Sequence, residues 1–245
     1  MNDETIDDLQ LDGLMLIQKK NNFKFGVDAV LLSNFAKVKK GDKILDIGTG
    51  TGIIPVLMVA KTQENHITGL EIQKDMADMA FRSIQMNKMC DRVSIVQGDI
   101  KDWDKLFGKA KFDLIVCNPP YMQSNAGIHN VNDAKAIARH EVKCTLEDVV
   151  RASAGLLKPY GRLAIIHRPA RLVDIMVVFR DNFIEPKTLR FIHSNPTSMP
   201  SMVLIQGTKQ GKKELKILQN LYIFDQDGNY SKEINQIYGR LPERE

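Results

Sequence analysis

The four consecutive residues Asn118-Pro119-Pro120-Tyr121 have the side chains and the backbone rigidity to hold a planar amino group. The two prolines restrict the backbone, so the Pro119 carbonyl and the Asn118 side-chain oxygen can form a fixed pair of hydrogen-bond acceptors. Such a pair engages both hydrogens of a planar NH2 group and leaves its lone pair free to attack an electrophile. Tyr121 adds an aromatic face on which a base can stack. A purely structural turn at the two prolines is the alternative interpretation.

A second segment, Asp46-Ile47-Gly48-Thr49-Gly50-Thr51-Gly52, has the glycine content of a ligand-binding turn. Glycines allow positive φ and close approach to a ligand, and the helix expected after the turn offers free N–H groups. The dinucleotide pattern G-x-G-x-x-G fails because Ile53 takes the place of its third glycine, and the lysine of a P-loop is missing. Asp46 stands where its carboxylate can meet an amine rather than a phosphate.

The glycine-rich segment resembles the first motif of class I S-adenosylmethionine-dependent methyltransferases. The resemblance implies that Gly48, Gly50 and Gly52 wrap the methionine part of S-adenosyl-L-methionine. It also implies that Glu71 holds the ribose hydroxyls, for which its two oxygens are suited, and that Asp99 accepts the adenine amino group. A helix cap, a surface acid and a common Gly-Asp turn are the alternatives for these acids. The amino group held by Asn118 and Pro119 would then attack the sulfonium methyl group.

The Asn118–Tyr121 motif resembles that of methyltransferases acting on adenine N6, cytosine N4 or the amide of glutamine. The chain from about residue 10 to 240 resembles the family of tRNA N6-adenine methyltransferases that modify adenine 37 beside the anticodon of valine tRNA. Asn22–Leu32 and Arg139-His140-Glu141 carry this resemblance together with the two motifs above. It implies that Phe25 and Asp28 belong to a segment that closes over the methionine end of the cofactor. A core position for Phe25 and a helix-capping role for Asp28 are the alternatives.

Four other functions remain open at this point. A protein-glutamine methyltransferase acting on a release factor usually has a helical N-terminal domain, whereas only about 42 residues precede the first expected strand here. A ribosomal RNA adenine-N6 methyltransferase would share both motifs. A non-catalytic RNA-binding module would not need the acceptor pair of Asn118 and Pro119. The failed glycine spacing disfavours an NAD oxidoreductase.

Short β-branched runs alternate with helical stretches from residue 43 onward, which predicts βαβ units and a doubly wound, mostly parallel seven-stranded sheet. The segments near residues 191–193 and 202–207 are joined by too few residues for a helical crossover, so these two strands should pair antiparallel. A small N-terminal hairpin is expected from 9–18 and 23–25. The other expected strands are 43–47, 66–70, 92–96, 112–117 and 162–167, and the expected helices are 27–35, 53–61, 74–86 and 145–157.

The spacing of these elements predicts three parts of the chain. Residues 1–42 form the hairpin and a helix that cap the catalytic part, 43–210 form the methyltransferase domain, and 211–245 form an extension packed on the same domain. The three cysteines and five histidines show no ligand spacing, so no metal site is expected.

The formal net charge of +4 is unevenly distributed. Residues 1–12 carry five acids and no base, which leaves 34 bases against 25 acids in the rest of the chain. A basic body suits a structured RNA such as tRNA, with Arg139, Lys212 and Lys213 as candidate phosphate contacts. There is no insertion large enough for a DNA-recognition domain, and no obligatory protein partner is evident. No apolar run approaches membrane-spanning length and no export signal is present, so a cytoplasmic, membrane-free location is expected.

Overall fold

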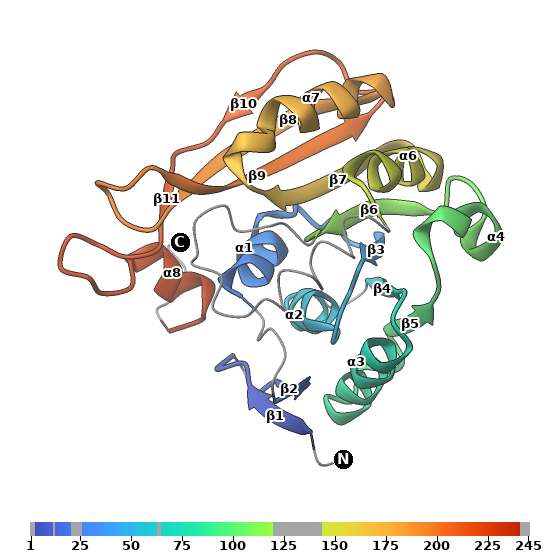
Figure 1. The fold of residues 1–245 in the computed structure, drawn as a ribbon, viewed down its shortest axis with the longest axis horizontal. Helices are drawn as coiled ribbons and strands as arrows, with labels where there is room; N and C mark the ends of the chain where they lie inside the picture. Colours follow the sequence, from blue (N-terminus) through green and yellow to red (C-terminus); the bar gives the residue numbers. More distant parts are fainter. Residues whose placement is uncertain (1–2, 12, 21–25, 63–64, 120–143, 241–245) are drawn as a thin grey trace.

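The computed structural model describes residues 3–11, 13–20, 26–62, 65–119 and 144–240. A single twisted sheet runs through the molecule, with helices on both of its faces (Figure 1). Its seven long strands follow the order β8-β9-β7-β6-β3-β4-β5, and the two-residue strands β10 and β11 pair with β8. The strands are β3 (Lys43–Ile47), β4 (His66–Glu71), β5 (Val93–Gln97), β6 (Phe112–Cys117), β7 (Leu157–His167), β8 (Ile184–His193), β9 (Pro200–Lys209), β10 (Lys216–Ile217) and β11 (Leu221–Tyr222).

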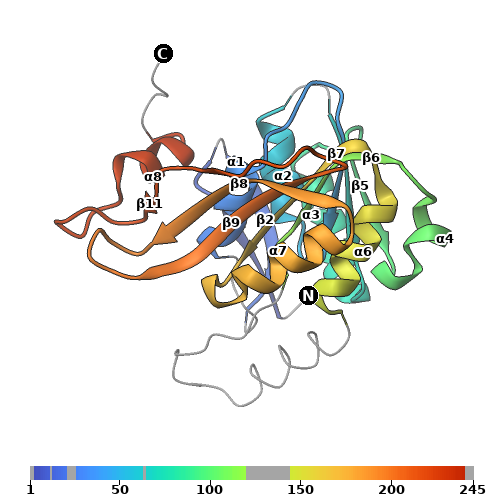
Figure 2. The same cartoon turned by 90° about the horizontal axis from the view of Figure 1, so that it is seen from above.

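Among the described strands of this sheet, only β9 runs against its neighbours, which confirms the expected antiparallel late strand. It pairs antiparallel with both β7 and β8, whereas β3 to β7 are mutually parallel. β9 therefore crosses from the turn after β8 to the side of the sheet where β7 begins (Figure 2). We call the side where β3 to β7 end the carboxyl edge, and the side where they begin the amino edge.

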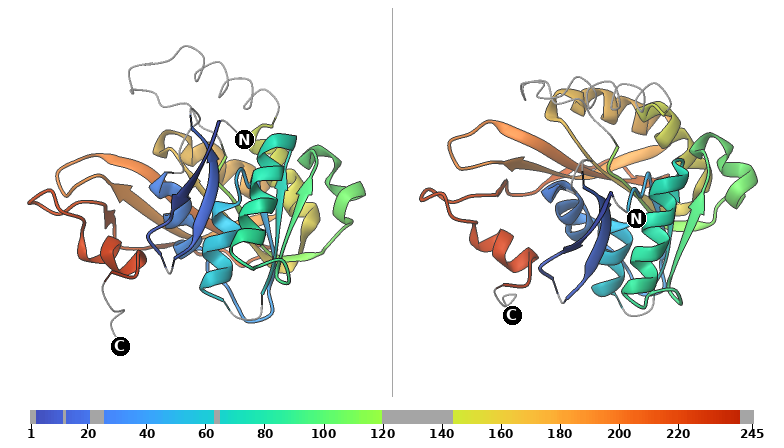
Figure 3. Two further views of the ribbon diagram at one scale, coloured as in Figure 1. Left: turned by 90° about the horizontal axis from the view of Figure 1, so that it is seen from below. Right: turned by 60° about the horizontal axis from the view of Figure 1, so that its bottom comes forward.

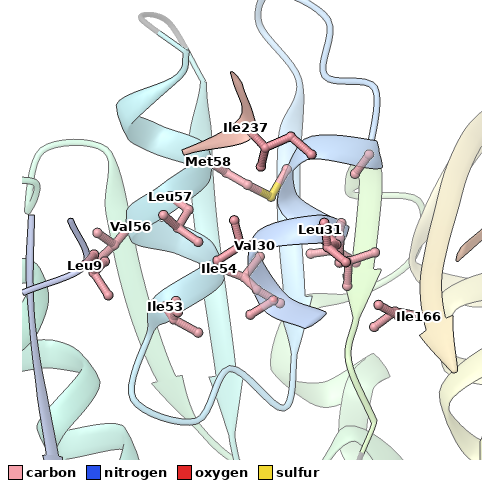
Figure 4. Packing of buried hydrophobic residues seen from close by; sticks show 14 of the residues in the cluster. Leu9, Val30, Leu31, Ile53, Ile54, Val56, Leu57, Met58, Ile166 and Ile237 are labelled. Atoms are coloured by element: carbon pink, nitrogen blue, oxygen red, sulfur yellow. The ribbon is translucent and has the colours of Figure 1, made fainter. Parts of the chain in front are cut away.

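Two apolar layers cover the two faces of the sheet. One includes the apolar sides of α1 (Val27–Phe35), α2 (Ile53–Ala60), α3 (Lys74–Met86) and α8 (Lys232–Ile237). Figure 4 shows part of this layer, in which Val30 and Ile54 lie between α1 and α2. The other layer includes side chains of α4 (Trp103–Phe107), α6 (Leu146–Leu156) and α7 (Leu172–Asp181). Alternate residues of each strand point to opposite layers, and the hydrophobic effect keeps the apolar ones within those layers. Residues at the strand ends lie beyond the layers and can contribute to a binding site.

Thr145 is the N-cap of α6, at the first position of the helix expected over 145–157. Its hydroxyl accepts the Asp148 amide at 3.2 Å, and the Asp148 carboxylate accepts the Thr145 amide at 3.2 Å, which completes a capping box. β7 begins earlier than expected, at Leu157 rather than at Arg162. The pairing of this strand with β6 is irregular, and Tyr160 within it takes a positive φ of 62°.

The N-terminal hairpin exists, but it lies earlier in the chain than the sequence predicts. Its strands are β1 (Glu4–Asp8) and β2 (Met15–Lys19), and it lies against α3 (Figure 3). Asn87 at the end of α3 accepts the Met15 amide at 3.0 Å and donates to the Met15 carbonyl at 2.7 Å. Glu4 of β1 forms a two-pronged ion pair with Arg82 of α3.

Among the described residues, no helix has the length and apolar character needed to cross a membrane. No group of three or more metal-ligating side chains gathers within the same part of the chain.

Candidate active site

The glycine-rich turn lies at the carboxyl edge, between β3 and α2. Gly48, Gly50 and Gly52 have φ values of 72°, 57° and 89°, a region that side chains with a Cβ rarely adopt. The amides of Gly48 and Thr49 both donate to the Leu70 carbonyl, at 2.9 and 3.0 Å, and so attach the turn to β4. A Cβ at Gly48 or Gly50 would meet nothing within 4 Å, which leaves the space above the turn open for a ligand.

Gly52 has a different role from the two glycines before it. A Cβ added there would lie 3.3 Å from the Cβ of Ala80, so the third glycine allows α2 to start close against α3. Two of the three glycines therefore line open space, and the third serves packing.

Glu71 ends β4 with its carboxylate turned toward the glycine-rich turn. Its Oε2 accepts the Gly50 amide at 2.9 Å and its Oε1 accepts the Gln73 amide at 2.9 Å. The residue is buried, and its Oε1 also accepts the Gln73 side-chain amide at 3.5 Å, so Oε2 is the oxygen with capacity for a second hydrogen bond. This arrangement fits a hydroxyl donor on a ligand above the turn.

Asp46 is fully buried in β3, and neither of its carboxylate oxygens has a hydrogen-bond partner within the described chain. Burial raises the pKa of Asp46 to about 7, and the negative charge of Glu71 adds to this rise. The Thr49 hydroxyl offsets part of the pKa shift but does not reach hydrogen-bonding geometry, and its oxygen is itself buried without a partner. Buried polar groups are normally paired, so these atoms indicate a site for a polar or cationic ligand group.

Asn118 follows β6 directly, and its side-chain oxygen is also buried without a partner in the described structure. Asp46 and Val116 are paired across β3 and β6, and Ile44 and Val116 both belong to the layer with α1 and α2. Continuing the alternation of side chains places Asp46 and Asn118 on that same face of adjacent strands. The structure thus brings the two sequence motifs together, and both supply unpartnered oxygen atoms.

Of the remaining predicted site residues, some lie in described elements and others lie outside the described residues. Asp28 lies in the first turn of α1, with its carboxylate oxygen 2.5 Å from where a Cβ on Gly26 would stand. Asp99 follows β5 and accepts the Lys101 amide at 2.9 Å, so it caps a short 3₁₀ turn at the carboxyl edge. Phe25, Pro120, Tyr121 and Arg139 lie outside the described residues.

Lys212 and Lys213 are not near the motif residues. They follow β9, and because β9 is antiparallel to β7 they lie at the amino edge, opposite Asn118. Both are exposed.

Sequence reasoning did not single out Thr49 or Gly69 as parts of the site. A Cβ on Gly69 would lie 2.8 Å from the Thr49 hydroxyl, so Gly69 creates the space that the Thr49 side chain fills against β4. A glycine inside the strand 66–71 was the available signal, because an interior glycine often marks a close approach by another segment.

Comparison with known proteins agrees with this geometry. A family model described as the methyltransferase small domain matches residues 22–173. The chain belongs to this family. Membership confirms the methyltransferase assignment and disfavours the oxidoreductase and the non-catalytic RNA-binding module.

Relatives and solved structures extend the family assignment. A tRNA1(Val) (adenine(37)-N6)-methyltransferase from Porphyromonas gingivalis is 33% identical over 187 residues, which are 74% of this chain and 72% of the relative. A protein of the same name from Bacteroides fragilis is 27% identical over 89% of this chain and 92% of its own. A predicted O-methyltransferase from Agrobacterium tumefaciens has a TM-score of 0.71 at 19% identity, covering 86% of this chain and 95% of that one. The last match confirms the Rossmann-like methyltransferase fold.

A geranyl diphosphate C-methyltransferase from Streptomyces coelicolor, solved with S-adenosyl-L-homocysteine, shares this fold with a TM-score of 0.54. Its sequence identity is 17%, and the match covers 74% of this chain and 79% of that one.

Proposed function

We propose that the protein transfers a methyl group from S-adenosyl-L-methionine to the N6 amino group of an adenine in tRNA, and that the adenine is position 37 of valine tRNA. The observation that carries the proposal is the buried, unpartnered oxygen of Asn118 beside Asp46, at the carboxyl edge of a methyltransferase sheet. The names of the relatives from Porphyromonas gingivalis and Bacteroides fragilis supply the substrate. We place the protein in the cytoplasm because its proposed substrate is tRNA.

The residues of the site fit the proposed cofactor. When bound, S-adenosyl-L-methionine supplies an electrophilic methyl group on a sulfonium. The Asp46 carboxylate suits the ammonium of the methionine part, and the open space above Gly48 and Gly50 admits its backbone. Glu71 is placed for the ribose hydroxyls, and Asp99 stands next along the same edge for the adenine amino group. We assign Phe25 and Asp28 to the segment that covers the methionine end.

The Asn118 side chain and the Pro119 carbonyl hold the target amine by accepting its two hydrogens. This orientation would aim the nitrogen lone pair at the methyl group that the bound cofactor would supply, and the amino proton released on methylation would pass to solvent. The main contribution of the protein is then to position the amine, because the amine is itself the nucleophile and needs no separate activating group. Pro120 and Tyr121 complete the motif as the rigid turn and the stacking face, and Arg139 is assigned a phosphate contact.

The direct test is methylation of unmodified valine tRNA with labelled S-adenosyl-L-methionine, followed by mass spectrometry of the digested nucleosides. We expect N6-methyladenosine in the wild-type transcript and none in a transcript with guanine at position 37. Label in a release factor but not in tRNA would favour the glutamine methyltransferase. Label in ribosomal RNA alone would move the substrate to the ribosome.

A further inference from the structure

Seven exposed lysines lie at the amino edge, on the side of the sheet away from Asn118. None of them forms an ion pair within the described parts of the chain. We name them the amino-edge lysine row: Lys37, Lys39, Lys43, Lys109, Lys111, Lys212 and Lys213.

Three basic residues near the carboxyl edge, unlike the lysines of the row, form ion pairs with acidic residues. Lys101 and Arg151 both pair with Asp148, at 3.5 and 2.5 Å, and Arg171 pairs with Asp174 at 2.6 Å. Their charges are partly neutralised by these acids. These three bases of the described chain therefore have acidic partners, whereas the lysines of the row have none within it.

Direct contacts connect the adjacent strand ends near which the row lies. Asp113 of β6 accepts the Lys43 amide of β3 at 3.0 Å and the Lys158 ammonium of β7 at 2.7 Å. Lys209 of β9 donates to the Leu157 carbonyl of β7 at 2.8 Å. The row thus runs over neighbouring strand ends rather than over separate faces.

The row continues to β8, where Lys187 donates to the Lys212 carbonyl at 3.0 Å. From β3 to β8 the edge crosses five strands, which corresponds to about 19 Å at the usual spacing between strands. A basic strip of this length suits an extended chain of phosphates better than one small anion.

A buried ion pair holds one part of the row in place. Arg162 pairs with Asp42 at 2.5 Å, and both side chains are almost fully buried. Arg162 also donates to the Lys37 carbonyl, and Asp42 accepts the Lys39 amide at 2.6 Å. The loop before β3 therefore has a fixed backbone that presents its lysines outward, which lowers the entropy lost when a partner binds.

Two strongly exposed aromatic residues stand among these lysines. Tyr160 is 72% exposed beside Lys158, and Phe183 is 78% exposed and bonded through its carbonyl to the Gln210 amide at 2.7 Å. Both residues have positive φ values, 62° and 58°. Aromatic rings interspersed with lysines are typical of surfaces that bind the bases and phosphates of RNA.

We propose that the amino-edge lysine row binds the phosphate backbone of the tRNA body, outside the loop that carries the target adenine. The inference rests on the proposed function. β6 separates Lys111 from Asn118 by about 20 Å, a distance that a folded tRNA can span while its anticodon loop occupies the carboxyl edge. The row contributes affinity for the whole RNA, whereas the carboxyl edge selects the base.

The test compares two RNAs: intact valine tRNA, and a hairpin containing only its anticodon stem and loop. Binding of each is measured by fluorescence anisotropy at several salt concentrations, with the Lys212→Glu/Lys213→Glu and Lys109→Glu/Lys111→Glu variants. We expect each variant to bind intact tRNA at least tenfold more weakly than wild type, with a shallower salt dependence because fewer counterions are released. The affinity for the hairpin should change much less.

The Lys105→Glu/Lys232→Glu variant is the matched control, because it makes the same charge change outside the row. It should weaken tRNA binding by less than threefold, and calorimetry with S-adenosyl-L-homocysteine verifies that all three variants are folded. An equal loss for both RNAs, or no loss, overturns the proposal. Loss of binding to anionic lipid vesicles without loss of tRNA binding would assign the row to a membrane surface and also overturn it. A wild-type protein that binds tRNA without methylating it would refute the proposed function, while the binding comparison would still decide the role of the row.

Discussion

The backbone amide of Gly50 donates a 2.9 Å hydrogen bond to Oε2 of Glu71, which joins the glycine-rich turn to the end of β4. The same carboxylate accepts the Gln73 amide with its other oxygen, at 2.9 Å. Glu71 therefore holds the turn in shape while its Oε2 can accept a further bond. One side chain can organise the turn and recognise the ligand.

Replacing Glu71 by Gln should weaken S-adenosyl-L-homocysteine binding by about 1–3 kcal/mol. The amide nitrogen cannot accept a hydrogen bond, so one backbone amide or one ribose hydroxyl loses its partner. Isothermal titration calorimetry measures the change. Asp75→Asn is the control, since Asp75 is exposed in the first turn of α3 and pairs only with Lys19 among the described residues. Equal affinities for wild type and Glu71→Gln would remove the ribose assignment.

Cofactor binding should depend on pH through Asp46. Burial raises the pKa of Asp46 to about 7, so the carboxyl is largely neutral below that pH and cannot attract an ammonium group. Affinity should therefore rise about tenfold between pH 5.5 and 7, with uptake of the ligand accompanied by release of one proton. Titrations in buffers of different ionisation enthalpy measure both quantities.

Asp46→Asn separates this effect from other titrating groups. The variant should bind the cofactor weakly and lose the pH dependence. A carboxyl with a raised pKa binds its proton more tightly in the folded protein, so wild-type stability should fall relative to Asp46→Asn as pH rises from about 4 to 7. A parallel pH dependence of the two proteins in both measurements would contradict the role of Asp46.

Asn118→Ala should lower kcat by more than tenfold, which is at least about 1.4 kcal/mol of transition-state stabilisation, while cofactor affinity stays within about twofold. The variant removes one of two acceptors for the target amine and leaves the glycine-rich turn untouched. Asn118→Asp retains an acceptor oxygen and should keep more activity than the alanine variant. A chelator should have no effect on turnover by the wild type. Loss of cofactor binding in Asn118→Ala would show that this residue shapes the cofactor site instead.

Short runs of apolar and β-branched residues predicted the strands of the sheet well, because each strand is buried between two apolar layers. The range 43–47 was correct because Ile44, Leu45 and Ile47 are buried, and the helix expected over 145–157 is present as α6. The hairpin position was wrong because its first strand is acidic, and its partners on α3, such as Arg82, are distant in sequence. Neither α4 nor α7 was assigned. Lys212 and Asn118 lie at opposite edges of the sheet because β9 is antiparallel to β7. A count of basic residues along the sequence contains no information on strand direction.

Gly155 of α6 lies under the ring of Trp103 of α4, at the contact between these two helices. A Cβ at Gly155 would overlap several carbons of the indole. Helix propensity favours alanine over glycine by about 1 kcal/mol, but overpacking of this kind costs about 1–3 kcal/mol. Gly155→Ala should therefore destabilise the protein, as measured by urea unfolding, in spite of the better helix former.

The Trp103→Leu background provides the control, because a smaller side chain leaves room for the added methyl group. There Gly155→Ala should become neutral or stabilising, so the effects of the two substitutions should not add. Destabilisation of the same size in both backgrounds would mean that the methyl group meets another neighbour. Stabilisation in the wild-type background would show that the indole can move aside, and the close packing of α4 on α6 would then contribute little to stability.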